Sequence, residues 1–336
     1  MTPPEQHDPP GNRTTPPEQH DLPGNRTTPP DQHDLPGNRT GPLGWEDLPG
    51  ALVREVERRL GRAAAGFAER HGGFTGGVRG VLTLAGGGRV FVKAVPAGSP
   101  HAADYRAEAV VGAALPPGVP APRFLFSCEA AGWVLLCSEV APGRIPHEPW
   151  HDDELAAALA LLTACARELT PSPLEGLPTL AGRMSGRCEL WNTLDPARAG
   201  AWERARLPRL AAVERRWTAL VTGGTLLHFD PRFDNILIDR DGTASLVDWG
   251  RACTGPAWAD LVCLLLQSDL GPRDPERLLT THPLGRRAPA DQVDALLVAL
   301  LGYWTRSATA PAPPALRDRR ERSRRATLAW LRTRWP

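Results

Sequence analysis

Lysine is almost absent from this chain of 336 residues. Lys93 is the single lysine among 39 basic residues, and all the others are arginines. The composition is rich in Ala, Gly, Pro and Arg, which is typical of a GC-rich coding sequence in which arginine has replaced surface lysine. A lysine that persists in this background is expected where a compact ammonium is required and a planar guanidinium does not fit. Contact with a phosphate in a tight pocket is one such use.

Net charge and long apolar runs are also lacking. The formal net charge is +1, so the chain has no general electrostatic attraction for nucleic acid. The longest apolar run, residues 155–166, is interrupted by Thr163 and is shorter than the ~20 residues of a membrane-spanning helix. The N-terminal sequence has neither the basic start nor the apolar core of a secretory signal. We therefore expect a cytoplasmic protein without a membrane or nucleic-acid partner.

Cysteine pairs with the spacing of a metal site or a redox motif are missing. The chain has six cysteines, and no two of them form a CxxC pattern. This spacing favours neither a zinc site nor a disulfide framework. We expect all six to be buried, reduced thiols.

A short repeat occupies the N-terminus. Residues 2–40 consist of three copies of a 13-residue unit, TPPEQHDPPGNRT and two close variants. Each copy offers at most one leucine for burial, which cannot offset the entropy lost on ordering. We expect residues 1–44 to form a disordered tail with polyproline II character.

Apolar periodicity begins at Trp45 and predicts an α+β protein. The strand-like segments fall in the first half and the helix-like segments in the second, which favours two lobes, an N-lobe at 45–138 and a C-lobe at 139–336. One helix is expected before the strands, with apolar positions from Leu52 to Leu60 and an end near Gly61–Gly66. The expected strands are 78–84, 89–95, 123–127 and 133–140, and the expected later helices are 152–169, 199–220, 257–268, 289–304 and 315–334.

The densest polar cluster lies at residues 226–250, LLHFDPRFDNILIDRDGTASLVDWG. It predicts a hairpin with strands at 235–238 and 243–247. Antiparallel pairing sets Asn235 opposite residues 246–247, so Asn235 and Asp248 emerge together at the open end. Two oxygen donors with few other protein ligands suit Mg²⁺. Asp230, on the loop before the hairpin, is placed to accept a proton from a substrate hydroxyl.

These residues resemble a known family. HFDPRFDN (228–235) is similar to the H-x-D-x-x-x-x-N catalytic loop of the protein-kinase-like fold, and DWG (248–250) is similar to its D-F-G. In detail the chain resembles the aminoglycoside phosphotransferase family of bacterial small-molecule kinases. The resemblance implies Asp230 as the base and Asn235 and Asp248 as magnesium ligands. It also implies that Arg232 contacts the γ-phosphate, as a lysine does in protein kinases.

The match has departures as well as further agreement. Gly255-Pro256 and Asp260-Leu261 resemble a later G-D-P-x-x-D-L segment, although the aspartate between glycine and proline is missing. Phe229 stands where the family has glycine. The loop also lacks the arginine of H-R-D, which argues against a protein kinase regulated by activation-loop phosphorylation.

The first half supplies matching nucleotide-binding residues. Lys93 lies on the second strand of the first hairpin, where the resemblance implies a phosphate-orienting lysine. Glu108 lies in a predicted helix and shares a face with Val111 and Leu115, so it is expected to point to the sheet, where a buried carboxylate needs a partner. The resemblance to the kinase-like fold implies that this partner is Lys93. The full inward stripe is predicted as Ala107, Val110, Val111, Ala114 and Leu115.

Two further nucleotide contacts are expected. The segment GGFTGG (72–77), with Gly76 and Gly77, precedes the first hairpin strand and is predicted to lie over the phosphates. Glu139 and Val140 follow the last strand, where the hinge between lobes is expected to offer backbone groups to a purine.

Together these features predict an ATP-dependent, Mg²⁺-requiring phosphotransferase that acts on a hydroxyl of a small molecule. One alternative is a kinase of the same fold for choline, homoserine, a fructosamine or a macrolide. The other is a nucleotide-binding pseudoenzyme whose tail recruits partners. Resemblance to a family indicates the reaction more securely than the acceptor.

The C-terminal segment bears on the charge of the acceptor. Residues 315–336 carry eight arginines against Asp318 and Glu321. If this helix borders the acceptor site, a substrate with several ammonium groups would be repelled. In the alternative arrangement the arginines meet solvent while Leu328, Trp330 and Leu331 pack inward. Independently of this choice, acidic residues such as Asp152, Asp153 and Glu154 could line the pocket from another helix.

Overall fold

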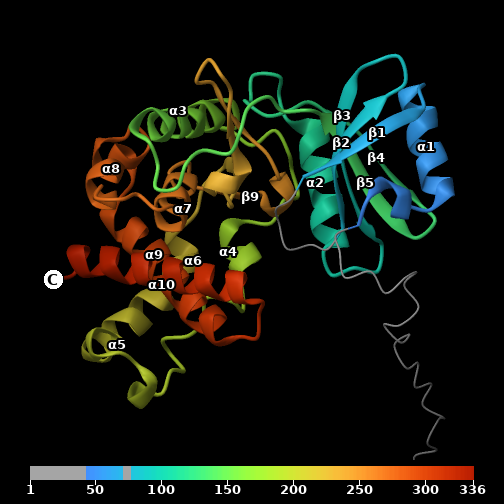
Figure 1. Cartoon of the computed structure of the whole chain (residues 1–336). Helices are drawn as coiled ribbons and strands as arrows, with labels where there is room; N and C mark the ends of the chain where they lie inside the picture. The colour runs from blue at the N-terminus through green and yellow to red at the C-terminus, as the bar shows by residue number, and fades with distance from the viewer. Residues whose placement is uncertain (1–42, 71–76) are drawn as a thin grey trace, which may run out of the picture. The chain divides into compact units, whose positions relative to one another are not determined.

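The computed structural model describes residues 43–70 and 77–336 (Figure 1). The repeat-containing tail expected at 1–44 lies almost entirely outside the described residues. Gly76 and the rest of the glycine-rich segment lie outside them too, apart from Gly77.

The N-terminal region is a five-stranded antiparallel sheet with a helix on each face. The strand order is β1-β2-β3-β5-β4. Leu52 and Val56 of α1 (Gly50–Leu60) are fully buried against one face, and α2 (Ala102–Ala114) covers the other (Figure 1). The strands are β1 (Ala64–Glu69), β2 (Val78–Leu84), β3 (Arg89–Pro96), β4 (Phe124–Ala130) and β5 (Trp133–Glu139).

Most of these elements match the sequence-based expectation, and two details differ. Strand β1 was not predicted, because it is an edge strand whose residues are largely exposed and show no apolar alternation. Val110 was placed on the inward stripe of α2 but is 57% exposed, whereas Val111 is buried. Neighbouring helix residues point about 100° apart, so both could not face the sheet.

The C-terminal region is mainly helical and contains the largest hydrophobic core. The segment predicted as one helix at 199–220 is two helices, α5 and α6, separated at Arg215–Arg216. The helices are α3 (Asp152–Glu168), α4 (Leu180–Met184), α5 (Ala201–Glu214), α6 (Trp217–Leu220), α7 (Ala259–Gln267), α8 (Pro275–Thr281), α9 (Ala290–Thr309) and α10 (Pro314–Arg334). Figure 1 shows α10 packed along α9. The expected α+β class is confirmed.

Two short antiparallel strand pairs carry the polar cluster. Strand β6 (Thr225–Leu227) pairs with β9 (Cys253–Gly255), and β7 (Ile236–Ile238) pairs with β8 (Ala244–Leu246). The second pair is the predicted hairpin. Its first strand starts one residue later than predicted, and its second strand is one residue shorter at both ends. Asn235 ends a 3-10 turn (Phe233–Asn235) instead of starting the strand.

All six cysteines are buried and free, as expected. No helix within residues 43–70 and 77–336 combines the length and apolarity needed to cross a membrane.

Candidate active site

A buried aspartate holds the backbone of the loop that follows β6. The carboxylate of Asp260, at the start of α7, accepts hydrogen bonds of 2.8 Å from the N–H groups of His228 and Phe229. Burial raises the pKa of Asp260 to about 6. In the sequence, Asp260 was noted only as part of the G-D-P-x-x-D-L segment. The contact of Asp260 with this loop depends on the fold and could not be predicted from the sequence.

His228 is a structural residue of this loop. Its ring is fully buried and lies edge-on to Trp249, with the ring centres 4.9 Å apart. Nδ1 accepts a hydrogen bond from the N–H of Asp230, so Nε2 is the donor to the carbonyl oxygen of Val247, 2.9 Å away. Burial lowers the pKa of His228 to about 4, which keeps the ring neutral at pH 7.

Asp230 is the carboxylate that this loop presents. Its Oδ2 lies 2.5 Å from Nη1 of Arg232, and Arg232 also binds Asp234 through Nε at 2.8 Å. Burial raises the pKa of Asp230 to about 6 despite the opposing effect of Arg232. Among the described residues, no side chain hydrogen-bonds to Oδ1, which leaves that atom able to accept a proton.

Asn235 and Asp248 meet at the end of the hairpin, as the spacing predicts. The N–H of Val247 donates to the carbonyl oxygen of Asn235 at 2.9 Å, which places the next residue, Asp248, beside Asn235. The Asn235 side chain is buried and donates through Nδ2 to the carbonyl oxygen of Asp230 at 2.9 Å. One loop and one hairpin therefore bring all three polar groups together.

Lys93 joins the sheet to this cluster. It lies on β3, opposite Arg79 of β2 and Leu136 of β5, and is only 6% exposed. Its Nζ forms an ion pair with Glu108, as predicted, and lies 3.0 Å from Oδ1 of Asp248. Burial disfavours the charged amine, but these carboxylates outweigh it and raise the pKa of Lys93.

The two carboxylates respond to Lys93 in opposite ways. Burial raises the pKa of Glu108 above its usual range, even beside the ammonium. The ammonium holds the pKa of Asp248 well below its usual range.

Backbone geometry accounts for two glycine positions of the family pattern, of which this chain keeps one. Phe229, in the position of the family's glycine, has φ of 63°, in the left-handed region that favours glycine. Gly250 packs against α2, where an added Cβ would lie 3.0 Å from the carbonyl oxygen of Asp104. Arg251 also reaches Asp104, at 3.4 Å, so α2 is tied to the DWG segment at two points.

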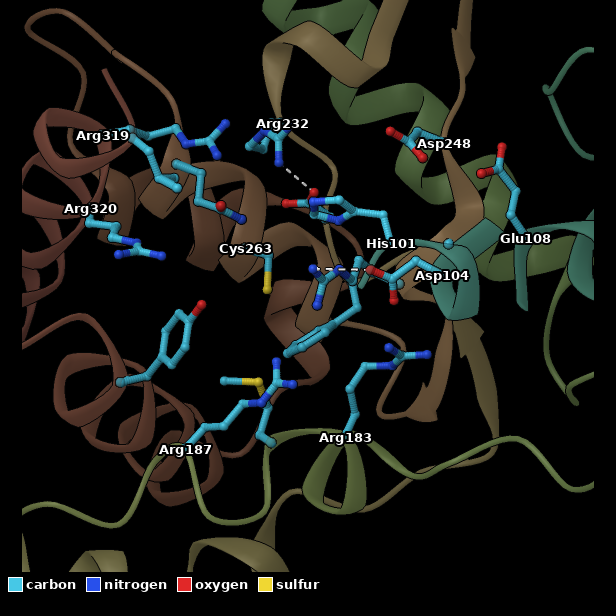
Figure 2. Close-up of a pocket in the computed structure, with 18 of the residues that line it drawn as sticks. His101, Asp104, Glu108, Arg183, Arg187, Arg232, Asp248, Cys263, Arg319 and Arg320 are labelled. Atoms are coloured by element: carbon cyan, nitrogen blue, oxygen red, sulfur yellow. Dashed lines mark hydrogen bonds and ion pairs between the residues drawn. The ribbon is translucent and has the colours of Figure 1, made fainter. Parts of the chain in front are cut away.

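Two cavities meet at this cluster. The smaller, of about 420 Å³, has apolar walls that include Val81, Leu136 and Val247. The larger, of about 440 Å³, is lined by Phe229 and Asp230 (Figure 2). Both are lined by Arg79, Lys93, Glu108, Arg232 and Asp248. Asn235 lies only on the smaller cavity and Asp230 only on the larger.

The expected hinge residues lie at the smaller cavity, whereas Gly77 does not. Glu139 and Val140 both line it. The N–H of Glu139 donates to the carbonyl oxygen of Arg123 at 2.9 Å, while the N–H of Val140 has no backbone partner among the described residues. A Cβ on Gly77 would collide with the carbonyl oxygen of Ala94, so close approach of the backbones explains this glycine.

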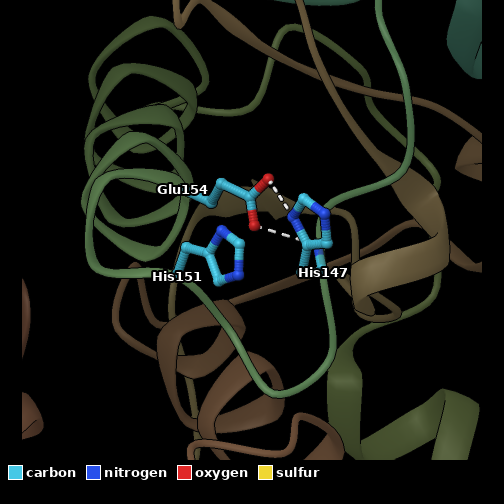
Figure 3. Close-up of side chains that lie close together, drawn as sticks. All are labelled: His147, His151 and Glu154. Atoms are coloured by element: carbon cyan, nitrogen blue, oxygen red, sulfur yellow. Dashed lines mark hydrogen bonds and ion pairs between the residues drawn. The ribbon is translucent and has the colours of Figure 1, made fainter.

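The acidic residues at the start of α3 do not line the larger cavity. Glu154 is 2% exposed and binds Arg144 at 2.6 Å and the N–H and Nδ1 of His147 at 2.9 Å (Figure 3). His151 stacks on His147, with ring centres 4.0 Å apart. Although these three side chains could hold a metal ion by distance, Arg144 already neutralises the only carboxylate. Asp152 pairs with Arg273 instead of facing the cavity.

The C-terminal helix does border the larger cavity. Leu316, Arg319 and Arg320 of α10 line it, while Trp330 and Leu331 are buried in the core, as expected. The helix therefore presents arginines to the cavity at one end and apolar side chains to the core at the other.

Comparisons with known proteins relate this chain to a fold and to a family. Solved structures with the same fold include choline kinase LicA from Streptococcus pneumoniae, at 14% identity and a TM-score of 0.58, covering 83% of this chain and 98% of that one. A putative fructosamine-3-kinase from Thermobifida fusca is 18% identical, with a TM-score of 0.53 and 83% and 98% coverage. Amicoumacin kinase hAmiN, in complex with AMP-PNP and Ca²⁺, is 12% identical, with a TM-score of 0.53 and 82% and 95% coverage.

At these identities the structural matches establish the fold, which is that of small-molecule kinases. Comparison with functionally curated proteins gives no match. The family comparison covers most of the chain, because residues 72–308 match the phosphotransferase enzyme family. This range contains Lys93, Asp230 and Asp248 in the geometry described above. The chain therefore belongs to the phosphotransferase enzyme family.

Proposed function

We propose that this protein transfers the γ-phosphate of ATP to a hydroxyl group of a small molecule. The observation that carries the proposal is the junction of the two cavities at Lys93, Arg232 and Asp248. A nucleotide in the smaller cavity and an acceptor in the larger one would meet there. In-line phosphoryl transfer requires this arrangement of donor and acceptor.

The smaller cavity suits the nucleotide. Its apolar walls fit a purine ring, and Val140, whose N–H has no backbone partner among the described residues, belongs to its lining. Lys93 lines both cavities, and its ammonium would orient the α- and β-phosphates while Glu108 holds it in place. The amicoumacin kinase of the same fold was solved with AMP-PNP, which supports this assignment.

Asn235 and Asp248 are the residues that would hold Mg²⁺. Both line the smaller cavity, and an amide oxygen and a carboxylate are donors that Mg²⁺ prefers. When bound, Mg²⁺ neutralises negative charge on the phosphates. The lowered pKa of Asp248 keeps this carboxylate ionised and able to coordinate a cation.

Asp230 is the proposed base. Its carboxylate faces the larger cavity, and Oδ1 would take the proton of the acceptor hydroxyl as that oxygen bonds to the γ-phosphorus and ADP leaves. Arg232, bound to Oδ2, fixes the carboxylate and places a cation beside the transferred phosphoryl group.

A direct assay tests this function. The protein is incubated with ATP, Mg²⁺ and a small-molecule extract of the source cells, and mass spectrometry searches for a product that has gained one phosphoryl group. We expect such a product with wild-type protein and none with Asp230→Asn. Binding of ATP and Mg²⁺ without any turnover would instead support a nucleotide-binding pseudoenzyme. The chain argues against that alternative, because it has the complete set of Lys93, Glu108, Asp230, Asn235 and Asp248.

A further inference from the structure

The larger cavity is strongly basic. Of the described residues that line it, eight are Lys or Arg and four are Asp or Glu. Every one of these four carboxylates already forms an ion pair with a lining cation. The pairs are Asp104 with Arg251, Asp230 with Arg232, and both Glu108 and Asp248 with Lys93.

Three of the arginines have no carboxylate partner among the described residues. Arg183, on α4, donates through Nη2 to the carbonyl oxygen of Ala252 at 2.9 Å, while its Nε is buried without a hydrogen-bond partner. Arg320, on α10, donates only to the carbonyl oxygen of Ser307 at 3.0 Å. The guanidinium of Arg187 makes no hydrogen bond or ion pair with a described residue. Figure 2 shows the three arranged around the cavity.

Two of these guanidinium groups, those of Arg183 and Arg187, repel each other. Burial lowers the pKa of Arg183, and the nearby charges of Arg251 and Arg187 lower it further, while the charge of Asp104 opposes them. Arg183 and Arg320 are half-buried, and Arg187 is exposed. A half-buried cation without an anion is unfavourable, and a cluster of cations is more so. Such a cluster is stabilised when a ligand brings the missing negative charge.

ATP does not bring that charge to these residues. Arg183, Arg187 and Arg320 line the larger cavity and are absent from the lining of the smaller one, where the nucleotide is proposed to bind. They share the larger cavity with Asp230, on the side of the acceptor.

We propose that the acceptor carries an anionic group, a carboxylate or a phosphate, which Arg183, Arg187 and Arg320 bind while its hydroxyl faces Asp230. This inference rests on the proposed function and names the substrate class of the same site. A guanidinium donates two parallel hydrogen bonds to such a group, so the arginines also fix the orientation of the acceptor. The cavity, at about 440 Å³, has room for a hydroxylated acid of moderate size.

Binding to three matched probes tests the proposal. Gluconate, glucitol and glucamine share one polyol chain and end in a carboxylate, an alcohol and an ammonium. Each is titrated calorimetrically into protein saturated with Mg²⁺ and AMP-PNP, so that the phosphate site is already filled. We expect gluconate to bind about tenfold or more tightly than glucitol, and glucamine to bind most weakly.

Variants assign the binding to the arginines. Arg183→Gln and Arg187→Gln are each expected to weaken gluconate binding about tenfold and to leave glucitol binding unchanged. Arg322→Gln is the control, because Arg322 is exposed on α10 and lines neither cavity. Arg187→Gln removes no described contact, so it keeps the test decisive if Arg183→Gln does not fold.

Several results would overturn the proposal: no gluconate binding, glucamine binding as tight as gluconate, or variants that bind gluconate like wild type. A wild-type protein that does not bind Mg²⁺ and AMP-PNP would contradict the proposed function instead. The two failures are therefore distinguishable in one experiment.

Discussion

Arg232 and Asp230 form a short ion pair, with Nη1 of the arginine 2.5 Å from Oδ2 of the aspartate. The two residues are separated by Pro231 alone, and the arginine reaches back to the carboxylate while its Nε binds Asp234. The pair fixes one oxygen of the proposed base and leaves the other toward the cavity. The positive charge of Arg232 lowers the pKa of Asp230 and so opposes burial, which raises it.

The first prediction concerns the base itself. Asp230→Asn keeps the size of the side chain and removes the proton acceptor, so kcat should fall at least ~100-fold. The Kd for Mg²⁺ and AMP-PNP should change little, because Asp230 does not line the smaller cavity. Steady-state kinetics and calorimetry measure the two effects. Unaltered turnover would exclude Asp230 as the base.

The second prediction concerns pH. A base must be ionised to accept a proton, and the pKa of Asp230 is raised to about 6. Activity should therefore be full above this pKa and fall as the pH drops through it. Arg232→Gln removes the cation that lowers this pKa, so the acid limb of the kcat/KM profile should move to higher pH. An acid limb that stays in place in this variant would contradict the assignment.

The third prediction concerns the single lysine. Lys93→Arg conserves the charge, but the side chain is buried between Glu108 and Asp248 and its ammonium lies 5.0 Å from the centre of the Tyr105 ring. A guanidinium is larger and planar, so kcat/KM for ATP should fall even though the charge remains. Arg89→Lys, at the exposed start of β3, is the control in the opposite direction. Equal ATP kinetics in Lys93→Arg and wild type would show that the ammonium is not required.

The fourth prediction concerns Asp260. Its carboxylate accepts hydrogen bonds from the N–H groups of His228 and Phe229, so Asp260→Ala leaves these two N–H groups of the loop without an acceptor. The free energy of unfolding should fall by about 1–3 kcal/mol, and kcat should fall because Asp230 loses its position. Denaturant unfolding and kinetics measure both, with Asp318→Ala on the exposed face of α10 as the control. A stable variant with normal kcat would mean that Asp260 does not position the loop.

The fifth prediction concerns polycationic drugs. Arg319 and Arg320 border the larger cavity, and a like charge at ~4–6 Å costs about 1 kcal/mol in water and more near a protein surface. Kanamycin-like amines should therefore be poor acceptors compared with neutral or anionic alcohols. Acceptor-dependent ATP consumption across both classes measures this. A kcat/KM for an aminoglycoside above ~10⁴ M⁻¹s⁻¹ would contradict the prediction.

Features set by local spacing could be predicted from the sequence. The hairpin turn after Asn235 fixes which residues pair, so the meeting of Asn235 with Asp248 followed from counting. The inward direction of Glu108 followed from its helix face and its need for a partner from the cost of a buried unpaired charge, whereas the choice of Lys93 as that partner followed from the family resemblance. The fold class followed from the order of strand-like and helix-like segments.

Features that depend on packing between distant segments could not be predicted. The contact of Asp260 with the loop at His228 joins residues that are far apart in the chain. The two residues belong to separate sequence motifs, and these motifs do not say how far apart their side chains lie in the fold. The sequence left open whether the α10 arginines face solvent or a cavity, because a basic helix is compatible with both. In the folded chain α10 packs along α9, and Arg319 and Arg320 line the cavity that Asp230 also lines. Arg183 and Arg187 could not be singled out from the sequence. Arginine accounts for all but one of the basic residues, so a single arginine becomes informative only when its neighbours in the fold are known.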